Sequence, residues 1–168
     1  MIPRSVTDNL KRFLTRQSDA LHIQALVDGL QYEQHTGQSL APQEGAVVSL
    51  FANTEDAALA HAGPWLINPE RVTHIVDLSE LEQTRPSVIW LITWRDIAEQ
   101  AEKLRPYLSI ETPDFRLALL RFWDPRVFSS LYETFQNEKE RKLFKTAFEW
   151  QYLHEGQRRY INDYAPTE

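Results

Sequence analysis

Four charged residues have types and positions that could carry out hydrolysis. Asp28 closes an apolar segment at residues 21–27, and Asp124 closes a second one together with Arg121 and Arg126. Two carboxylates that meet in a fold can share general acid and base roles on a phosphoester or glycosidic bond. A small hydrolase that uses Asp28 and Asp124 is therefore one interpretation of this pattern.

The same residues are also typical of a structural ionic cluster, which is the interpretation we favour. Residues 116–123 predict a buried strand that contains Arg121, and a buried charge needs a partner. Asp124 is suited to cap the helix that Pro125 begins. Adjacent arginines keep carboxylates ionised, which hinders general-acid catalysis. We predict no catalytic residue, and a cluster that locks a strand to a helix: Asp28, Arg121, Asp124 and Arg126.

A series of aromatic residues follows this cluster and is the better lead to function. Most of them must fill a core, because large apolar side chains are usually buried. The remainder could line a groove for an apolar partner helix. The candidate partner-binding residues are Phe128, Tyr132, Phe135, Phe144, Phe148, Trp150 and Tyr152.

Other kinds of chemistry lack their sequence signals. The chain has no cysteine, which excludes disulfides and thiolate chemistry, and its 5 histidines show no metal-ligand spacing. Its 5 glycines form no phosphate-binding loop, and no G-x-S-x-G motif offers a hydrolase nucleophile. We expect neither a metal site nor a cofactor.

Composition favours a soluble protein that does not bind nucleic acid. The 168 residues carry a net charge of −6, whereas nucleic-acid binders usually present a basic face. The longest apolar runs, such as residues 88–93, are far too short to span a membrane. The first residues, Met-Ile-Pro-Arg, lack the apolar core of a signal peptide. We therefore expect a cytoplasmic location and no membrane partner.

Strands that alternate with helices predict an α/β fold, with a mixed β-sheet and flanking helices. Strands are predicted at residues 21–27, 46–51, 65–68 and 87–93, and helices at 7–17, 55–61, 69–78 and 95–107. Residues 30–45 are polar and predict a long loop. Residues 109–112 and 116–123 predict two strands of a hairpin.

After residue 123 the pattern becomes mainly helical. Residues 149–152 and 159–161 predict either a terminal hairpin or an extension of the last helix. We expect one domain over residues 1–168, with an α/β lobe at about 1–123 and a mainly helical C-terminal lobe at about 124–168.

Three segments, in this order, resemble a known family. Ala25-Leu26-Val27-Asp28-Gly29 is similar to its opening strand and turn. Ser49-Leu50-Phe51 with the later run Ala60-His61-Ala62-Gly63-Pro64-Trp65-Leu66-Ile67 is similar to its middle block, and Arg121-Phe122-Trp123-Asp124-Pro125-Arg126-Val127 to its closing block. The family is that of the effector-adaptor chaperones of bacterial type VI secretion (Tap/TEC type), first catalogued as a domain of unknown function. The resemblance spans residues 21–152.

The resemblance implies a cytoplasmic, non-enzymatic adaptor. Such a protein binds one cognate effector through the N-terminal region of the effector, and loads it onto the C-terminal extension of the secretion spike protein. Two alternatives stay open beside it. One is the small hydrolase that uses Asp28 and Asp124, and the other is an immunity-type protein that binds the toxic C-terminal domain of an effector.

Overall fold

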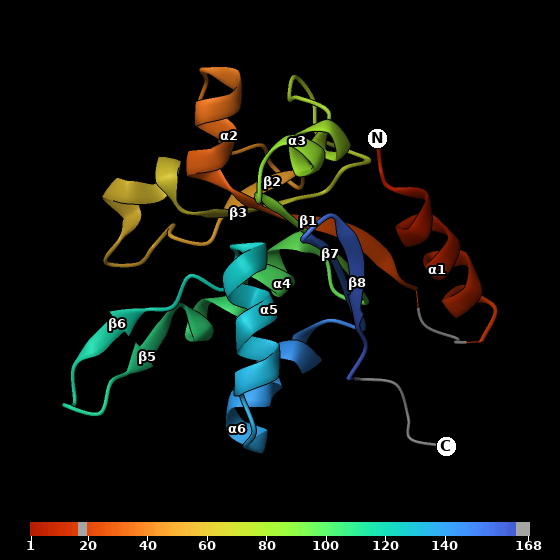
Figure 1. Cartoon of the computed structure of the whole chain (residues 1–168). Helices are drawn as coiled ribbons and strands as arrows, with labels where there is room; N and C mark the ends of the chain where they lie inside the picture. The colour runs from red at the N-terminus through yellow and green to blue at the C-terminus, as the bar shows by residue number, and fades with distance from the viewer. Residues whose placement is uncertain (17–19, 164–168) are drawn as a thin grey trace.

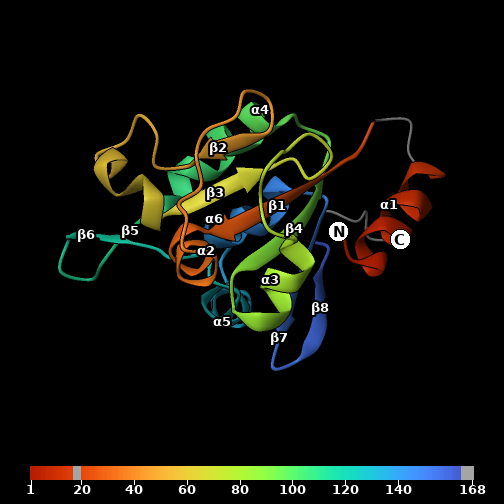
Figure 2. The same cartoon turned by 90° about the horizontal axis from the view of Figure 1, so that it is seen from above.

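The computed structural model describes residues 1–16 and 20–163, and its centre is a six-stranded antiparallel sheet with helices on both faces (Figures 1 and 2). The strand order is β2-β3-β1-β4-β7-β8. The strands are β1 His22–Asp28, β2 Val47–Ser49, β3 Pro64–Ile67, β4 Val88–Thr93, β7 Glu149–His154 and β8 Gln157–Ile161. Every pair in this sheet is antiparallel, so the sheet is not of mixed direction as the sequence predicted.

The two central strands, β1 and β4, are buried on both faces. Along β1, Leu26 contributes to one hydrophobic core, whereas Ala25 and Val27 contribute to the other. On β4, Leu91 and Trp90 divide between the two cores in the same way. Successive side chains of a strand point to opposite faces, so an unbroken apolar run requires helices on both sides.

Each core is closed by its own set of helices. The helices of one face are α1 Arg4–Leu14, α2 Gly29–Thr36 and α3 Leu78–Thr84. Those of the other face are α4 Ile97–Leu104, α5 Pro125–Thr134 and the 3₁₀ helix η3 Lys142–Thr146. The remaining helices are α6 Glu138–Arg141, η1 Ala57–Ala62 and η2 Arg105–Leu108. In the described residues no helix combines the length and the apolar character that crossing a membrane requires.

Acidic and amide side chains set the start of most α-helices. In each case the side-chain oxygen accepts a hydrogen bond from a free backbone N–H of the first turn. The capping residues are Asp28 for α2, Asp77 for α3, Asp96 for α4, Asp124 for α5 and Asn137 for α6.

Three local predictions differ from the structure. Residues 30–45 are not one loop, because α2 occupies their first part between the Asp28 cap and Gly37, which adopts the left-handed conformation that ends helices. Residues 69–77 contain no helix, and α3 begins only after the Asp77 cap. The predicted helix at 7–17 begins earlier, as α1, and its residue 17 lies outside the described residues.

The separate helical C-terminal lobe is not evident. After α6 and η3 the chain returns to the sheet, where β7 pairs with β4 and β8 pairs with β7. The predicted terminal hairpin is thus confirmed, and the helical alternative is wrong. Trp150 and Phe148 explain the difference, because Trp150 on β7 fills one core while Phe148, just before the strand, packs into the other. Their apolar surfaces are buried better in a strand between two layers than on a helix.

A second, two-stranded sheet stands apart from the main one. Its strands, β5 Ser109–Glu111 and β6 Leu117–Leu119, form the predicted hairpin, which projects from the body beside α4 and α5 (Figure 1). The prediction of a buried strand over residues 116–123 is wrong, because β6 ends at Leu119 and its side chains are largely exposed.

The edge strand β8 is fixed to α3 by a buried ion pair. Both guanidinium NH2 groups of Arg158 donate to the Glu82 carboxylate at 2.7 Å. The indole N–H of Trp90 donates to the same carboxylate at 3.1 Å. Glu82 is almost fully buried, so its charge depends on these donors.

Arg158→Ala is expected to lower the free energy of unfolding by about 3 kcal/mol, because it leaves the Glu82 carboxylate buried without its cation. Urea denaturation measures this change. The control is Arg159→Ala on the same strand, which is exposed and should change stability by less than about 0.5 kcal/mol. Equal effects of the two substitutions would contradict the assignment.

Candidate functional site

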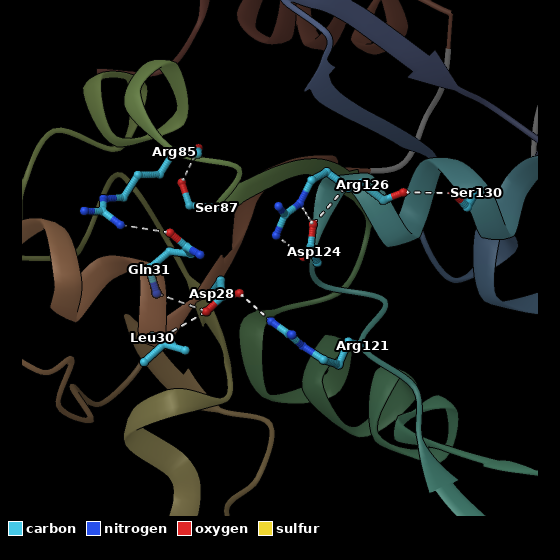
Figure 3. Close-up of polar contacts among 9 residues, drawn as sticks. All are labelled: Asp28, Leu30, Gln31, Arg85, Ser87, Arg121, Asp124, Arg126 and Ser130. Atoms are coloured by element: carbon cyan, nitrogen blue, oxygen red, sulfur yellow. Dashed lines mark hydrogen bonds and ion pairs between the residues drawn. The ribbon is translucent and has the colours of Figure 1, made fainter.

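The structure brings the four predicted cluster residues together where β1 ends and α5 begins (Figure 3). We call Asp28, Arg121, Asp124 and Arg126 the ionic turn. Asp28 is fully buried, and its Oδ1 accepts the backbone N–H groups of Leu30 at 3.0 Å and Gln31 at 3.2 Å. Its Oδ2 faces the guanidinium of Arg121 at 3.4 Å.

Asp124 is the second carboxylate of the ionic turn. Its Oδ1 accepts the backbone N–H of Arg126 at 2.9 Å, which caps α5. The guanidinium of Arg126 folds back onto the same carboxylate, with Nε at 3.1 Å from Oδ1 and NH2 at 2.8 Å from Oδ2. This paired geometry is the strong form of an arginine–carboxylate interaction.

The two carboxyl groups titrate in opposite directions. Burial raises the pKa of Asp28, and the N–H groups of Gln31 and Leu30 and the charge of Arg121 offset this only in part. Burial also acts to raise the pKa of Asp124, but the hydrogen bonds and charge of Arg126 outweigh it and hold that pKa below its ordinary value. Each carboxylate accepts three hydrogen bonds, so the direction is decided by the depth of burial and by how closely a guanidinium approaches.

Both carboxylates are buried, and the cations cover them from the solvent side. The side chain of Arg121 is 48% exposed and that of Arg126 is 59% exposed. Arg121 lies in the loop after β6 and not inside a strand, which corrects the prediction from sequence. A substrate in solution would reach the arginines before either carboxylate, an arrangement that suits structure better than acid–base chemistry.

The ionic turn forms the root of the projecting hairpin. Leu120 closes the hairpin by donating its N–H to the carbonyl of Leu108 at 2.7 Å. Arg121 follows, and the next two side chains, Phe122 and Trp123, are buried in the core. The ring of Trp123 packs edge-on against Phe51, with centroids 5.7 Å apart. The hairpin is therefore anchored by two aromatic side chains and two ion pairs.

The hairpin itself exposes apolar surface that the sequence analysis missed. Phe115 is 86% exposed, Leu117 is 79% exposed and Leu119 is 47% exposed. Leu117 and Leu119 alternate along β6, so their side chains share one face, and Phe115 lies in the turn before the strand with a φ of 62°. We call these three exposed residues the apolar ridge. Contiguous exposed apolar residues on a folded protein mark interaction sites. Leu117 and Leu119, with Arg116 before them, were the available signal, since apolar residues at alternate positions are typical of a strand with an apolar face.

The opposite face of the hairpin borders a groove of about 550 Å³. Ile110 and Leu120 line it from the hairpin, Tyr107 from η2 and Phe135 from the end of α5. Lys139 and Lys142 lie at its other side. The hairpin thus carries apolar side chains on both faces, one over open solvent and the other over the groove.

Most of the predicted partner-binding aromatics are buried in the core, and their contact with a partner stays a prediction. The buried members of the set are Phe128, Phe135, Phe144, Phe148, Trp150 and Tyr152. Phe128 packs against Phe144 at a centroid distance of 5.3 Å. Tyr132 is partly buried, and its hydroxyl donates to Asp163 at 3.0 Å. Phe135 alone among the lining residues of the groove belongs to the predicted set.

Comparison with known proteins places the site within a family. A family profile described as a domain of unknown function (DUF4123) matches residues 24–142. The chain belongs to this family. The matched region runs from β1 through α6 and contains the ionic turn, the hairpin and the groove. No curated protein and no solved structure gave a significant match.

Asp124→Ala is expected to lower the free energy of unfolding by about 1–2 kcal/mol, because α5 loses its cap while the half-exposed Arg126 loses little. Thermal or urea denaturation measures the change. The control is Asp8→Ala on the exposed face of α1, which should be nearly neutral. Unchanged stability of the Asp124 variant would refute the structural role of the ionic turn.

Asp28→Asn is expected to change the pH dependence of stability. Asparagine keeps the cap on α2 but removes a carboxyl group whose pKa is raised by burial. A raised native pKa means that the folded state binds the proton more tightly than the unfolded state does. The contribution of this carboxyl group to folding stability is therefore complete below about pH 3.9 and is lost as pH rises through the native pKa. The variant should therefore gain stability relative to the wild type as pH rises over that range. Urea denaturation at a series of pH values measures the difference, and a difference that falls with pH would contradict the assignment.

Proposed function

We propose that the protein is a cytoplasmic, non-enzymatic adaptor of bacterial type VI secretion. In this proposal it binds a cognate effector, through the effector's N-terminal region, and helps to load it onto the C-terminal extension of the spike protein. Membership of the DUF4123 family and the three matching sequence blocks support it. The observation that carries it is the apolar ridge, exposed on a hairpin whose root is buried.

Burial of this ridge would supply the binding free energy. Covering one large apolar side chain contributes about 1.5–3 kcal/mol, and Phe115 and Leu117 are almost fully available. An isolated two-stranded hairpin is marginally stable in water. Its firm anchorage through Phe122 and Trp123 therefore indicates a preorganised projection, which loses little entropy when a partner docks.

The same surface would also suit an immunity-type protein, so the two functions must be separated by the part of the effector that binds. An adaptor engages the N-terminal region, which leaves the toxic domain free to act after delivery. An immunity protein engages the toxic domain itself and protects the cell that makes it. For the hydrolase, by contrast, neither carboxylate is open to a substrate, since Asp28 is buried and Asp124 is engaged by Arg126.

A pull-down from the native host tests the proposal. Tagged protein is recovered and co-purifying chains are identified by mass spectrometry, with an unrelated tagged protein as control. We expect a spike protein and a multidomain effector. The N-terminal and C-terminal parts of that effector are then co-expressed separately with the chain, and the N-terminal part alone should co-purify. Binding to the toxic domain alone would favour the immunity function, and recovery of neither protein would overturn the proposal.

A further inference from the structure

The two sheets present four outer strand edges within the described residues, and three of them are covered or charged. At β2, Gln43 exchanges backbone hydrogen bonds with Val47, and Arg105 donates to the carbonyls of Ser49 and Leu50 at 3.1 Å. The β8 edge carries Arg158 and Arg159, and the β5 edge carries Glu111. Charges at an edge discourage the addition of another strand.

The β6 strand itself, Leu117–Leu119, carries no charged side chain, and the exposed Arg116 stands just before it. Leu120 and Leu108 are hydrogen-bonded partners, as are Arg116 and Thr112. Since bonded and non-bonded pairs alternate in an antiparallel ladder, Ala118 points its N–H and C=O toward β5. Leu117 and Leu119 point theirs outward, to the free edge. The two residues with free backbone groups are thus also the two leucines of the apolar ridge.

We infer that β6 binds its partner by strand addition, and that the partner segment is an extended, uncharged stretch with alternating apolar residues. This inference rests on the proposed adaptor function, and it names the surface and the kind of effector segment. Leu117 and Leu119 carry no charge, although Glu111 lies opposite Leu117 on the same face, so apolar residues at alternate positions of an added strand are their complement. Main-chain bonds to Leu117 and Leu119 would provide affinity, and the alternating ridge side chains would provide selectivity.

Two other occupants fit less well. An amphipathic helix could cover the ridge side chains, but it would make no use of the outward N–H and C=O groups of Leu117 and Leu119, which an added strand pairs. A second copy of the chain could pair through β6, but the strand has only 3 residues. Such a contact falls far short of the roughly 800 Å² per partner of a stable interface. A longer partner segment, which can continue past the strand, avoids both problems.

A displayed library of random 12-residue peptides, selected on the purified chain, tests the inference without knowledge of the effector. We expect enriched peptides with apolar residues at every second position and no charge between them. A synthetic enriched peptide should slow amide hydrogen exchange at Leu117 and Leu119 by at least about tenfold, as measured by NMR. The amide of Ala118, already bonded to β5, is the internal control.

Leu117→Lys supplies the matched variant, because it places on β6 the kind of charge that the other edges carry. It should weaken peptide binding by about tenfold or more. Leu59→Lys, the same change at an exposed leucine on η1, should leave binding unchanged. The inference would be overturned by a selection that enriches no peptides, or only helical or unpatterned ones. It would also be overturned if the peptide slowed amide exchange at residues outside β6, or if the free chain formed a dimer that Leu117→Lys abolishes.

The effector pull-down separates this inference from the proposed function. If Leu117→Lys recovers the effector as well as the wild type does, the adaptor function stands and strand addition at β6 is wrong. If the wild type recovers no effector, the adaptor function fails, while the peptide selection still decides whether β6 accepts a strand.

Discussion

The exclusion of water from both faces of β1 and β4 is the constraint on which the rest of the structure depends. Two adjacent apolar strands in the middle of the sheet require a layer of helices on each side. The chain meets this requirement with α1, α2 and α3 on one face and α4, α5 and η3 on the other. Both faces are then covered by helices, and β6 lies outside this body in a separate two-stranded sheet with β5.

In the ionic turn, two aspartates with the same capping role have pKa values shifted in opposite directions by their surroundings. Asp28 and Asp124 both cap helices, and both are buried. Asp124 receives three hydrogen bonds from Arg126 and stays readily ionised, whereas Asp28 meets its guanidinium only at the long distance of 3.4 Å. The pair holds the root of the hairpin in place. The direction of each pKa follows from the burial of the carboxyl group and from the distance of its guanidinium.

The proposed adaptor mechanism joins these two features. The anchored hairpin presents a short apolar strand with a free edge, and the partner segment adds a further strand to that edge. Stability and recognition are divided in space, because the aromatic residues of α5, η3 and β7 fill the core while the ridge on β6 stays exposed. A partner segment that is aggregation-prone on its own would be shielded by the same contact.

The sequence by itself determined the α/β class, the central strands β1 and β4, the Asp124 cap of α5 and the hairpin turn, because these depend on local periodicity and local hydrogen bonds. It also brought Asp28 and Arg121 together as a hypothesis. Only the tertiary structure decided which apolar residues are inside. Phe128 and Phe144 are core residues and Phe115 and Leu117 are exposed, although all four are equally apolar. Whether an apolar residue is buried depends on what packs against it. The strand β7 lies between β4 and β8 in a sheet with helices on both faces, whereas β6 pairs with β5 in the projecting hairpin.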